Sequence, residues 1–360
     1  MLAEPAALTA ATTLQGDRAM KTIDFETHFA TQEWVDALYA NQDYPQFRHD
    51  PVSKNRRLFY FPGAGEPYGD VIIDKLLEMG APRLKLMDEA GIDVAVISLT
   101  SPGIERFERA QSVKLAWQAN DALAEAVDAH PDRYRGYCAL PIRDVDAAVE
   151  ELERSVKDLG LIGWKTHCNY GDIYLDDKRF WPILAKAQEL DAPIYLHPTM
   201  PKMEELRTYG VALAGPPFGF GVETALVMYR LILSGAFDAF PKLKLVLGHY
   251  GEFLPFLMHR IDWAYARPHV ISDTGATPPL KKKPSEYLRE NMWVSTSGNY
   301  LAAAFNCTRD ALGMDRILLG TDHPYDSMRE CMDFLAGLNL SEQEQSLLYE
   351  KNAAALGVKL

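Results

Sequence analysis

Residues 21–29, KTIDFETHF, run from a short apolar strand directly into polar side chains. A doubly wound sheet that binds nucleotides would place a glycine-rich phosphate turn after its first strand, and here Glu26, Thr27 and His28 take that place. Glu26 and His28 stand two residues apart, so a strand directs both side chains to one face, where they can share a metal ion. The stretch therefore favours a barrel over an open sheet.

Seven further segments have the same character: they are short, apolar and bounded by glycine, proline or charged residues. Amphipathic helical stretches lie between them, for example at 112–130, 144–160 and 177–190, with Asp144 and Asp177 as expected N-caps. This alternation predicts an α/β fold of the (β/α)8 TIM-barrel type. The expected strands are 21–26, 93–100, 134–140, 161–167, 192–197, 243–249, 291–297 and 316–322.

Three connections are too long to be simple loops, namely residues 29–80, 198–220 and 267–284. In a barrel the first two leave from the carboxyl ends of strands, where active sites are built, so we expect them to cover a pocket on that face. The third follows a helix, and we expect it on the opposite side as a surface or subunit contact.

The composition limits the class of protein. The net charge of −13 argues against a general nucleic-acid surface, and no apolar run approaches the ~18 residues that a membrane span needs. Residues 1–20 are rich in Ala and Thr, and we expect a disordered leader there before a single domain at 21–360. The cysteines are dispersed without a CxxC motif, which indicates free thiols in a cytoplasmic protein; they are Cys138, Cys168, Cys307 and Cys331.

Glu26, His28, His197 and Asp322 lie near the ends of expected strands and are all of metal-ligand type. The carboxyl ends of parallel strands meet at one end of a barrel, so we expect these four side chains to bind one divalent ion. A set of carboxylates and imidazoles without a thiolate suits Zn²⁺ but also Mn²⁺ or Mg²⁺, and the two carboxylates favour Mn²⁺ slightly.

His249 and Glu252, in GHYGE, stand at another strand end, where Glu252 can fix the tautomer of the imidazole and stabilise its charged form. His249 is therefore a candidate for an acid, a base or a polarising group. Arg260 follows Glu252 by eight residues, a little over two helical turns, so we expect the two on roughly one helix face. Other candidates for substrate binding follow strand ends or lie in the long connections: Tyr325, His167, Asn169, Phe218, Phe220, Arg56 and Arg57.

With these residues in place, the chain resembles the amidohydrolase superfamily, and within it the decarboxylase branch typified by aminocarboxymuconate-semialdehyde decarboxylase. The resemblance runs from about Lys21 to the C-terminus. The Glu-x-His opening, FGFGVETALVMYRLILSGAFDAFPKLKLVLGHYGEFLPF at 218–256 and the TDHPY motif are similar to sequences of γ-resorcylate, 2,3-dihydroxybenzoate and 5-carboxyvanillate decarboxylases. The resemblance implies metal binding or substrate contact for Glu26, His28, His197, Asp322, His249, Glu252, Arg260 and Tyr325.

The resemblance also implies non-oxidative decarboxylation of an ortho-hydroxylated aromatic acid, a reaction of aromatic compound catabolism, without an organic cofactor. Asp322 would protonate the ring carbon that bears the carboxylate, and His249, held by Glu252, would polarise or deprotonate the phenol. The substrate would be a small acid of the hydroxybenzoate or the carboxyvanillate type, and in an acid with a second carboxylate Arg56 or Arg57 would hold that group. The alternatives are a metal-dependent hydrolase, for example of a lactone, or a hydratase. Barrels of this kind associate, so we expect a homo-oligomer, a dimer or a tetramer.

Overall fold

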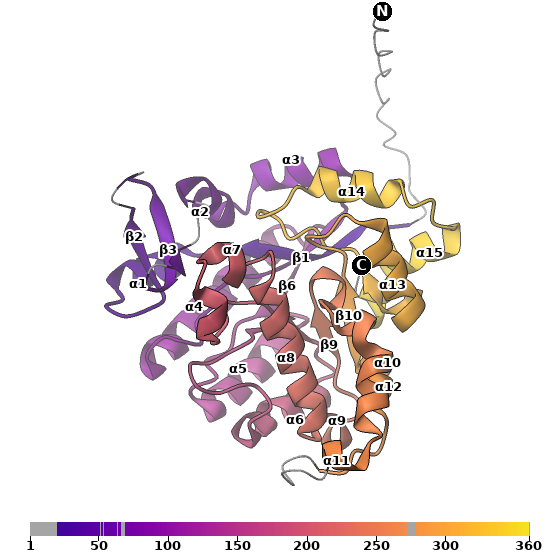
Figure 1. Cartoon of the computed structure of the whole chain (residues 1–360). Helices are drawn as coiled ribbons and strands as arrows, with labels where there is room; N and C mark the ends of the chain where they lie inside the picture. Colours follow the sequence, from indigo (N-terminus) through magenta and orange to yellow (C-terminus); the bar gives the residue numbers. More distant parts are fainter. Residues whose placement is uncertain are drawn as a thin grey trace, which may run out of the picture.

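The computed structural model describes residues 20–50, 52, 54–62, 64–65, 69–271 and 278–359, so the expected leader lies outside the described residues except for Met20. Within the described part, eight parallel strands with helices between them form a barrel (Figure 1), which confirms the expected fold. The order of the strands around the barrel follows the chain: β1 (Ile23–Phe29), β5 (Val94–Leu99), β6 (Tyr134–Cys138), β7 (Gly163–His167), β8 (Ile194–His197), β9 (Leu245–Leu247), β10 (Met292–Ser295) and β11 (Ile317–Leu318).

The barrel closes between β11 and β1 through an irregular stretch of chain. Regular pairing of β11 ends at Leu318, earlier than the expected end at Asp322. The chain nevertheless continues beside β1, because the N–H of Asp322 donates to the carbonyl of Glu26 at 2.9 Å and the N–H of His28 donates to the carbonyl of His323 at 2.8 Å. This closure places Asp322 next to the Glu26 and His28 pair.

Helices cover the outside of the barrel. The expected helices at 112–130 and 144–160 are α4 (Arg109–Ala129) and α5 (Val145–Lys157), and Asp144 caps α5 by accepting from the N–H of Ala147 at 3.3 Å. Asp177 caps a 3-10 turn, η1 (Lys178–Phe180), and α6 (Trp181–Glu189) follows it. The other helices and helical turns are α1 (Gln32–Ala40), α2 (Gly69–Leu77), α3 (Ala81–Ala90), η2 (Glu204–Arg207), α7 (Val211–Ala214), α8 (Gly219–Leu233), α9 (Ala236–Ala239), η3 (His249–Gly251), α10 (Leu254–Tyr265), α11 (Pro268–Ile271), α12 (Pro284–Asn291), α13 (Ala302–Leu312), η4 (Met314–Arg316), α14 (Met328–Ala336), α15 (Glu342–Ser346), η5 (Leu347–Lys351) and α16 (Asn352–Ala355).

The first long connection contains a small antiparallel sheet that the sequence did not predict. The Tyr60 hydroxyl donates to Ser101 Oγ at 3.3 Å, and Ser101 Oγ donates to Thr199 Oγ1 at 3.5 Å. The Arg207 guanidinium carbon lies 4.2 Å from the centroid of the Phe61 ring. These contacts join the first two long connections to the loop after β5, above the carboxyl ends of the strands, as expected. The strands of the small sheet are β2 (Gln46–His49), β3 (Arg56–Phe61) and β4 (Ala64–Gly65).

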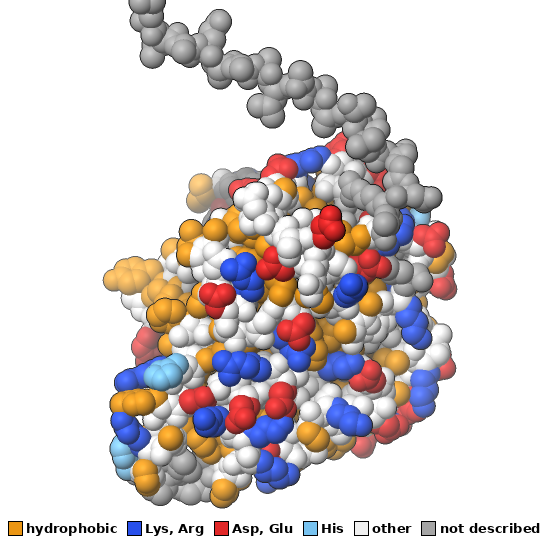
Figure 2. All heavy atoms as spheres, turned by 90° about the vertical axis from the view of Figure 1, so that its right-hand side faces the viewer, with side chains coloured by type: hydrophobic (Ala, Val, Ile, Leu, Met, Phe, Trp, Pro, Cys, Tyr) orange, Lys and Arg blue, Asp and Glu red, His pale blue; other side chains and the backbone are white. Residues whose placement is uncertain are grey.

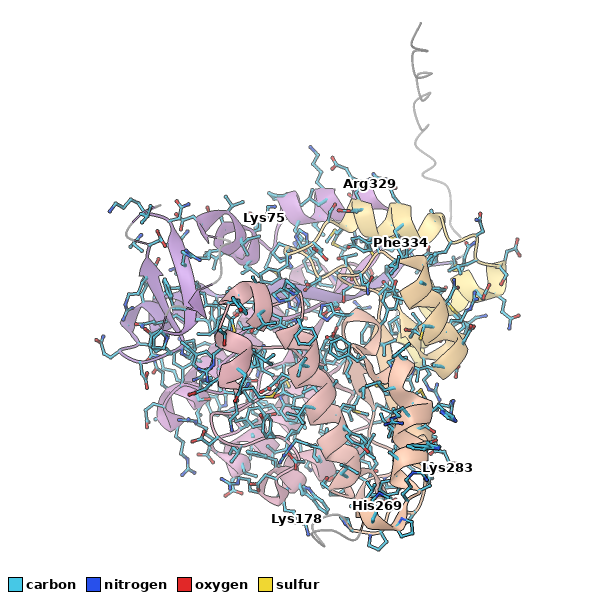
Figure 3. The ribbon with its side chains drawn as sticks, in the orientation of Figure 1. Lys75, Lys178, His269, Lys283, Arg329 and Phe334 are labelled. Atoms are coloured by element: carbon cyan, nitrogen blue, oxygen red, sulfur yellow. The ribbon has the colours of Figure 1, made fainter. Side chains whose placement is uncertain are left out.

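The third long connection holds α11 and leads into α12. His269 and Lys283, from this part of the chain, project at the opposite end of the molecule from Lys75 and Arg329 (Figure 3). Residues 272–277 lie outside the described part. A subunit contact at this segment stays a prediction.

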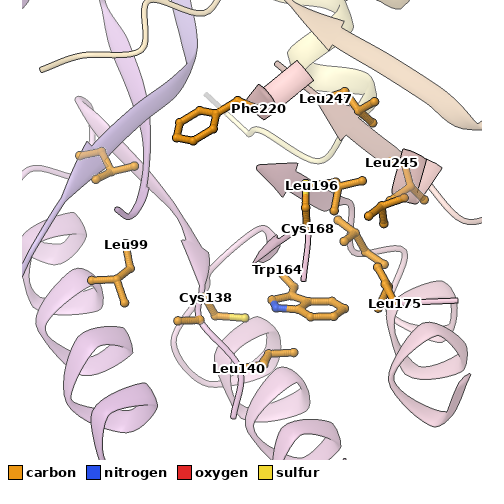
Figure 4. Close-up of a cluster of buried hydrophobic side chains, with 14 of the residues drawn as sticks. Leu99, Cys138, Leu140, Trp164, Cys168, Leu175, Leu196, Phe220, Leu245 and Leu247 are labelled. Carbon is orange, nitrogen blue, oxygen red and sulfur yellow. The ribbon is translucent and has the colours of Figure 1, made fainter. Parts of the chain in front are cut away.

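Two groups of buried side chains make the core. One lies between the sheet and its helices, where Cys138 and Trp164 from neighbouring strands lie near Leu140 (Figure 4). The other fills the barrel itself, where the Tyr137 ring centroid lies 5.8 Å from that of Phe25 and 5.9 Å from that of Tyr195. These rings pack against one another and fill the inside of the barrel.

On the face shown in Figure 2, acidic and basic side chains are interspersed among apolar ones. Among the described residues, no helix is long and apolar enough to cross a membrane. The four cysteines are free thiols, as expected, and three of them are buried.

Candidate metal and active site

Four expected ligands meet at the mouth of the barrel. Each of Glu26, His28, His197 and Asp322 offers one ligand atom, and these atoms all lie within 4.8 Å of one another. His28 Nε2 lies 2.8 Å from Asp322 Oδ1, and His197 Nε2 lies 3.9 Å from Glu26 Oε1. Ligands on opposite sides of a transition-metal ion stand about 4–4.5 Å apart, since each bond is about 2.0–2.2 Å long. The spacing of the cluster therefore fits one ion.

The hydrogen bonds of the cluster leave two buried atoms available for a cation. Ser295 Oγ donates to Glu26 Oε2 at 2.5 Å and Ser297 Oγ donates to the same oxygen, but Glu26 Oε1 has no hydrogen-bond partner among the described residues. His197 Nδ1 donates to the carbonyl of Pro198 at 2.8 Å, which leaves the lone pair on Nε2, also without a partner. A backbone acceptor on one imidazole nitrogen is the usual support for a metal on the other.

The two carboxylates of the cluster repel each other. Burial, and then the charge of Glu26, raise the pKa of Asp322 well above its usual range. The side chain of Glu26 is 1% exposed and that of Asp322 is 16% exposed, so water stabilises the two negative charges poorly. A divalent cation between them would remove this penalty, which is a second reason why the donor set fits a metal.

Asp24, which the sequence analysis missed, supports the cluster from below. Its carboxylate accepts from the N–H and the hydroxyl of Thr321, at 3.0 and 2.5 Å, and from the N–H of Glu26 at 3.2 Å. Burial raises the pKa of Asp24 to about 7. Asp24 thus ties β1 to the chain just before Asp322 and sets the distance between the two ligand-bearing segments.

His249 and Glu252 form the expected pair beside the cluster. His249 Nδ1 lies 2.8 Å from Glu252 Oε1, in the turn between β9 and α10. His249, Tyr250 and Glu252 all have positive φ, between 53° and 58°, a conformation that costs energy in residues other than glycine and is common at functional sites. Burial alone lowers the pKa of His249, but the charge and hydrogen bond of Glu252, together with the charges of Glu26 and Asp322, outweigh burial and raise the pKa to about 10.

His167 forms a second pair with a glutamate that the sequence did not suggest. His167 Nδ1 lies 2.9 Å from Glu105 Oε1, and both side chains are 3% exposed. The His167 ring centroid lies 5.6 Å from that of His197, its neighbour in register on β8. Burial lowers the pKa of His167 in spite of the charge of Glu105. Glu105 lies in an irregular loop, where no periodicity could have singled it out.

Lys165 is a buried lysine next to His28 that was not among the expected site residues. Its Nζ donates to the carbonyl of Leu99 at 2.6 Å and lies 3.3 Å from His28 Nδ1. Burial lowers the pKa of Lys165 to about 7. The signal in the sequence was its place two residues before His167, which puts both side chains on one face of β7.

Of the residues expected to bind substrate, Tyr325 lies next to the metal cluster, whereas Asn169, Phe218 and Phe220 have partners elsewhere. Tyr325 lies at the cluster, with its ring centroid 5.7 Å from that of His28 and its hydroxyl 2.6 Å from Thr100 Oγ1. Asn169 is buried, and its amide donates to the carbonyl of Met200 and to Glu223, so it links the loop after β8 to α8. Phe220 is buried in the core, whereas Phe218 is 45% exposed before α8, with its ring centroid 5.9 Å from that of Phe253.

The candidate arginines have partners outside the cluster. Arg56 forms ion pairs with Asp70 and Asp74, and Arg57 pairs with Asp50 at 3.0 Å. Arg260 is exposed on α10, with its guanidinium carbon 4.8 Å from the centroid of the Trp263 ring. The expectation that Glu252 and Arg260 share a helix face is wrong, because Glu252 has a φ of 58° and α10 begins only at Leu254.

Comparison with known proteins places this geometry in a family. The profile of the amidohydrolase family matches residues 23–356, so the chain belongs to that family. γ-Resorcylate decarboxylase of Rhodococcus jostii (strain RHA1) is 36% identical over 318 residues, which are 85% of this chain and 94% of the relative.

Solved structures agree with this assignment. The structure of 5-carboxyvanillate decarboxylase from Sphingomonas paucimobilis superposes with a TM-score of 0.84 at 31% identity, and the match covers 94% of this chain and 99% of that one. Dihydroxybenzoic acid decarboxylase from Polaromonas sp. JS666, solved with manganese and the inhibitor 2-nitroresorcinol, gives a TM-score of 0.78 at 34% identity over 94% and 96% of the two chains. These relatives confirm the expected class of enzyme, a metal-dependent carboxy-lyase.

Proposed function

We propose that this protein removes the carboxylate, without oxidation, from an aromatic acid that carries a hydroxyl ortho to it. One observation carries the proposal: a buried cluster of two carboxylates and two imidazoles, with two ligand atoms lacking partners among the described residues, in a chain related to γ-resorcylate decarboxylase. The residues that would hold the metal are Glu26, His28, His197 and Asp322.

A divalent ion bound there would supply positive charge to two substrate oxygens, one from the carboxylate and one from the neighbouring hydroxyl. The protein's part is to keep the ligands in place. Ser295 and Ser297 hold one oxygen of Glu26, and the carbonyl of Pro198 orients His197. Since two oxygens are needed, the hydroxyl ortho to the carboxylate should be essential in the substrate.

Asp322 is the proposed proton donor. Its side chain is 16% exposed, against 1% for His28 and 7% for His197, so it is the ligand most accessible from the mouth. Asp322 would give its proton to the ring carbon that bears the carboxylate. The bond from that carbon to the carboxylate then breaks, CO₂ leaves, and the bonding electron pair returns to the ring and restores its aromaticity. Solvent would return the proton to Asp322.

His249 would donate a hydrogen bond to the phenol oxygen of the substrate. Glu252 holds Nδ1, so Nε2 is the nitrogen that would meet the substrate. With its proton kept by the carboxylate of Glu252, the ring would donate a hydrogen bond to the oxygen as negative charge develops there. Tyr325, whose ring centroid lies 5.7 Å from that of His28, would contact the same substrate.

The arginines favour a simple hydroxybenzoate over a diacid of the carboxyvanillate type. Arg56 and Arg57 are already paired with Asp70, Asp74 and Asp50, so a second substrate carboxylate would have to compete with these partners. We keep a role for Phe218 and Arg260 as outer contacts of the pocket. A cytoplasmic homo-oligomer also stays a prediction.

A substrate panel tests the proposal. The purified protein is loaded with Mn²⁺, Zn²⁺ or Mg²⁺ and offered 2,6-dihydroxybenzoate, 2,3-dihydroxybenzoate and 5-carboxyvanillate, with 3-hydroxybenzoate as the control that lacks the ortho hydroxyl. We expect CO₂ release from an ortho-hydroxylated acid only. Equal turnover of 3-hydroxybenzoate would contradict the requirement for two oxygens, and acid release from lactones without CO₂ would indicate a hydrolase.

A further inference from the structure

His167 carries a buried nitrogen that none of the described residues satisfies. Its side chain is 3% exposed, and Nε2 has no hydrogen-bond partner within the described part of the chain. A buried polar atom left in this state costs about 1–3 kcal/mol, so such atoms are usually satisfied by a ligand or by ordered water. The nitrogen is therefore a place where a bound molecule would gain affinity.

Glu105 decides what Nε2 can bind. Glu105 accepts from the N–H of Ile104 at 2.8 Å, from the N–H of His167 at 3.2 Å and from Thr166 Oγ1 at 3.4 Å, so its carboxylate is well stabilised. The same carboxylate also accepts a hydrogen bond from the N–H of His167 Nδ1, at 2.9 Å. In the uncharged ring the other nitrogen then has no proton and is an acceptor only.

The position of His167 puts this acceptor on the inward face of the barrel and outside the group of metal ligands. His167 pairs in register with His197 across β7 and β8, and neighbouring residues in register point to the same face of a sheet. Lys165, two residues earlier, points into the barrel and reaches His28, which confirms that this is the inward face. His167 is nevertheless not among the four side chains whose ligand atoms lie within 4.8 Å of one another.

Gly103 shows that the loop after β5 is built around this ring. A Cβ added at Gly103 would lie 2.5 Å from Cε1 and Nδ1 of His167, and Gly103 has a φ of +66°. Trp34 Nε1 donates to the carbonyl of Gly103 at 2.9 Å, and this hydrogen bond fixes the position of the loop after β5. The ring is therefore clamped on its Nδ1 edge, and Nε2, on the other edge, is directed away from Glu105.

We propose that His167 Nε2 accepts a hydrogen bond from a second ring hydroxyl of the substrate, so that the Glu105–His167 pair selects hydroxyl over methoxyl at that position. The proposal takes the ligand class, a hydroxylated aromatic ring, from the proposed function. A hydroxyl can donate to the nitrogen, whereas a methoxyl group brings a second acceptor and leaves both unsatisfied. His167 acts here as a specificity-determining residue, and Glu105 as the positioning residue that sets its tautomer.

Binding rather than turnover gives the sharpest test. Calorimetry would measure the Kd of 2-nitroresorcinol and of its monomethyl ether, 3-methoxy-2-nitrophenol, with manganese-loaded protein. We expect the wild type to prefer the first by about tenfold or more, the scale of one buried hydrogen bond. His167→Asn should remove that preference, because an asparagine amide can still donate to Glu105 but carries no atom at the place of Nε2.

Three further measurements keep the test decisive. His130→Asn, the same substitution far from the cluster, should keep the full preference, and metal analysis should show equal manganese in all variants. Glu105→Gln, which frees the tautomer, serves as a second variant if His167→Asn does not fold, and it should weaken the preference. Equal affinity of the wild type for both ligands, no binding of either, or a full preference in folded His167→Asn would overturn the proposal. If the preference depends on His167 while no hydroxybenzoate releases CO₂, the proposed function fails and this inference stands.

Discussion

Each of the two histidine–glutamate pairs beside the cluster has the same kind of hydrogen bond, from Nδ1 of the histidine to the carboxylate of the glutamate. The pKa values of the two imidazole rings are nevertheless shifted in opposite directions. Nδ1 of His249 lies 2.8 Å from Glu252, and Nδ1 of His167 lies 2.9 Å from Glu105. The pKa of His249 is raised to about 10, whereas that of His167 is lowered. A glutamate partner therefore does not by itself decide whether a histidine is a charged donor or an uncharged acceptor.

The surroundings make the difference. The His249 side chain is 23% exposed and that of His167 is 3% exposed, so His167 loses more hydration. Besides their glutamates, His249 interacts with the carboxylates of Glu26 and Asp322, while His167 interacts with the cation of Lys165. Under the proposed function, the pocket would present a donor at His249 for the phenolate oxygen and an acceptor at His167 for a second hydroxyl.

The largest loss of activity should follow a substitution of Asp322, the carboxylate that interacts with His249. We expect Asp322→Asn to lower kcat on the order of 10²-fold or more, because the amide has no proton to give to the ring carbon. Stopped assays of CO₂ release measure this, with Asp333→Asn on the exposed face of α14 as the control. Turnover within a few fold of wild type in the metal-loaded variant would exclude Asp322 as the donor.

The charge of His249 should depend on Glu252. Burial lowers its pKa and the carboxylates raise it, so removing the charge in Glu252→Gln should let the pKa fall from about 10. If the charged ring is the active form, activity is lost as pH rises through this pKa, and the alkaline limb of kcat should move to lower pH by about one unit or more. A pH–rate profile of both proteins decides; a limb that moves upward, or does not move, would contradict the assignment of His249 as a charged donor.

Each pair also packs against a glycine, and alanine there should affect the two pairs differently. A Cβ at Gly298 would lie 2.7 Å from Cδ2 of His249, and one at Gly103 would lie 2.5 Å from the His167 ring. Both substitutions should lower the free energy of unfolding by about 1–3 kcal/mol, from the positive φ and the contact together. Gly298→Ala should lower kcat, and Gly103→Ala should mainly raise KM.

Gly160→Ala is the matched control for these two variants. Gly160 has a φ of +67°, and a Cβ there would meet nothing within 4 Å. It should therefore show the backbone cost alone, with unchanged kcat and KM. Urea unfolding and steady-state kinetics of the three variants measure both effects, and equal kinetic losses for Gly298→Ala and Gly103→Ala would show that the pairs do not have separate roles.

The smallest effect should come from the loop arginines, which lie outside both pairs. Because Arg56 is paired with Asp70 and Asp74, Arg56→Ala should change kcat/KM for a simple hydroxybenzoate by less than about threefold, the scale of an exposed ion pair. Arg57→Ala should behave alike. A loss of tenfold or more that is confined to 5-carboxyvanillate would instead assign the enzyme to diacids.

The fold and the ligands could be predicted because they depend on local patterns. Short apolar segments that alternate with amphipathic ones predict the barrel, and the side chains at the ends of its strands then have to meet. The expected strand ends carry Glu26, His28, His197 and Asp322, which the structure places within ligand distance of one another. The pair of His249 and Glu252 could also be predicted, because the two residues are close in sequence.

The rest depends on contacts between distant segments or on irregular backbone. Glu105 lies 62 positions from His167 in an irregular loop, and nothing in SPGIER marks it as a partner. The prediction that Glu252 and Arg260 lie on one helix face was wrong, because residues with positive φ precede the helix and α10 begins only at Leu254. The small sheet of the first long connection was missed because its strands are short and follow no clear alternation.

The most direct test of the central claim is the CO₂ released from 2,6-dihydroxybenzoate as Mn²⁺ is added back to metal-free protein. We predict that release rises in proportion to the metal and reaches its limit at one Mn²⁺ per chain, with one CO₂ for each substrate consumed. His197→Ala should neither retain the metal nor release CO₂. CO₂ release by the metal-free protein, or full metal binding in His197→Ala, would contradict a decarboxylase built on this cluster.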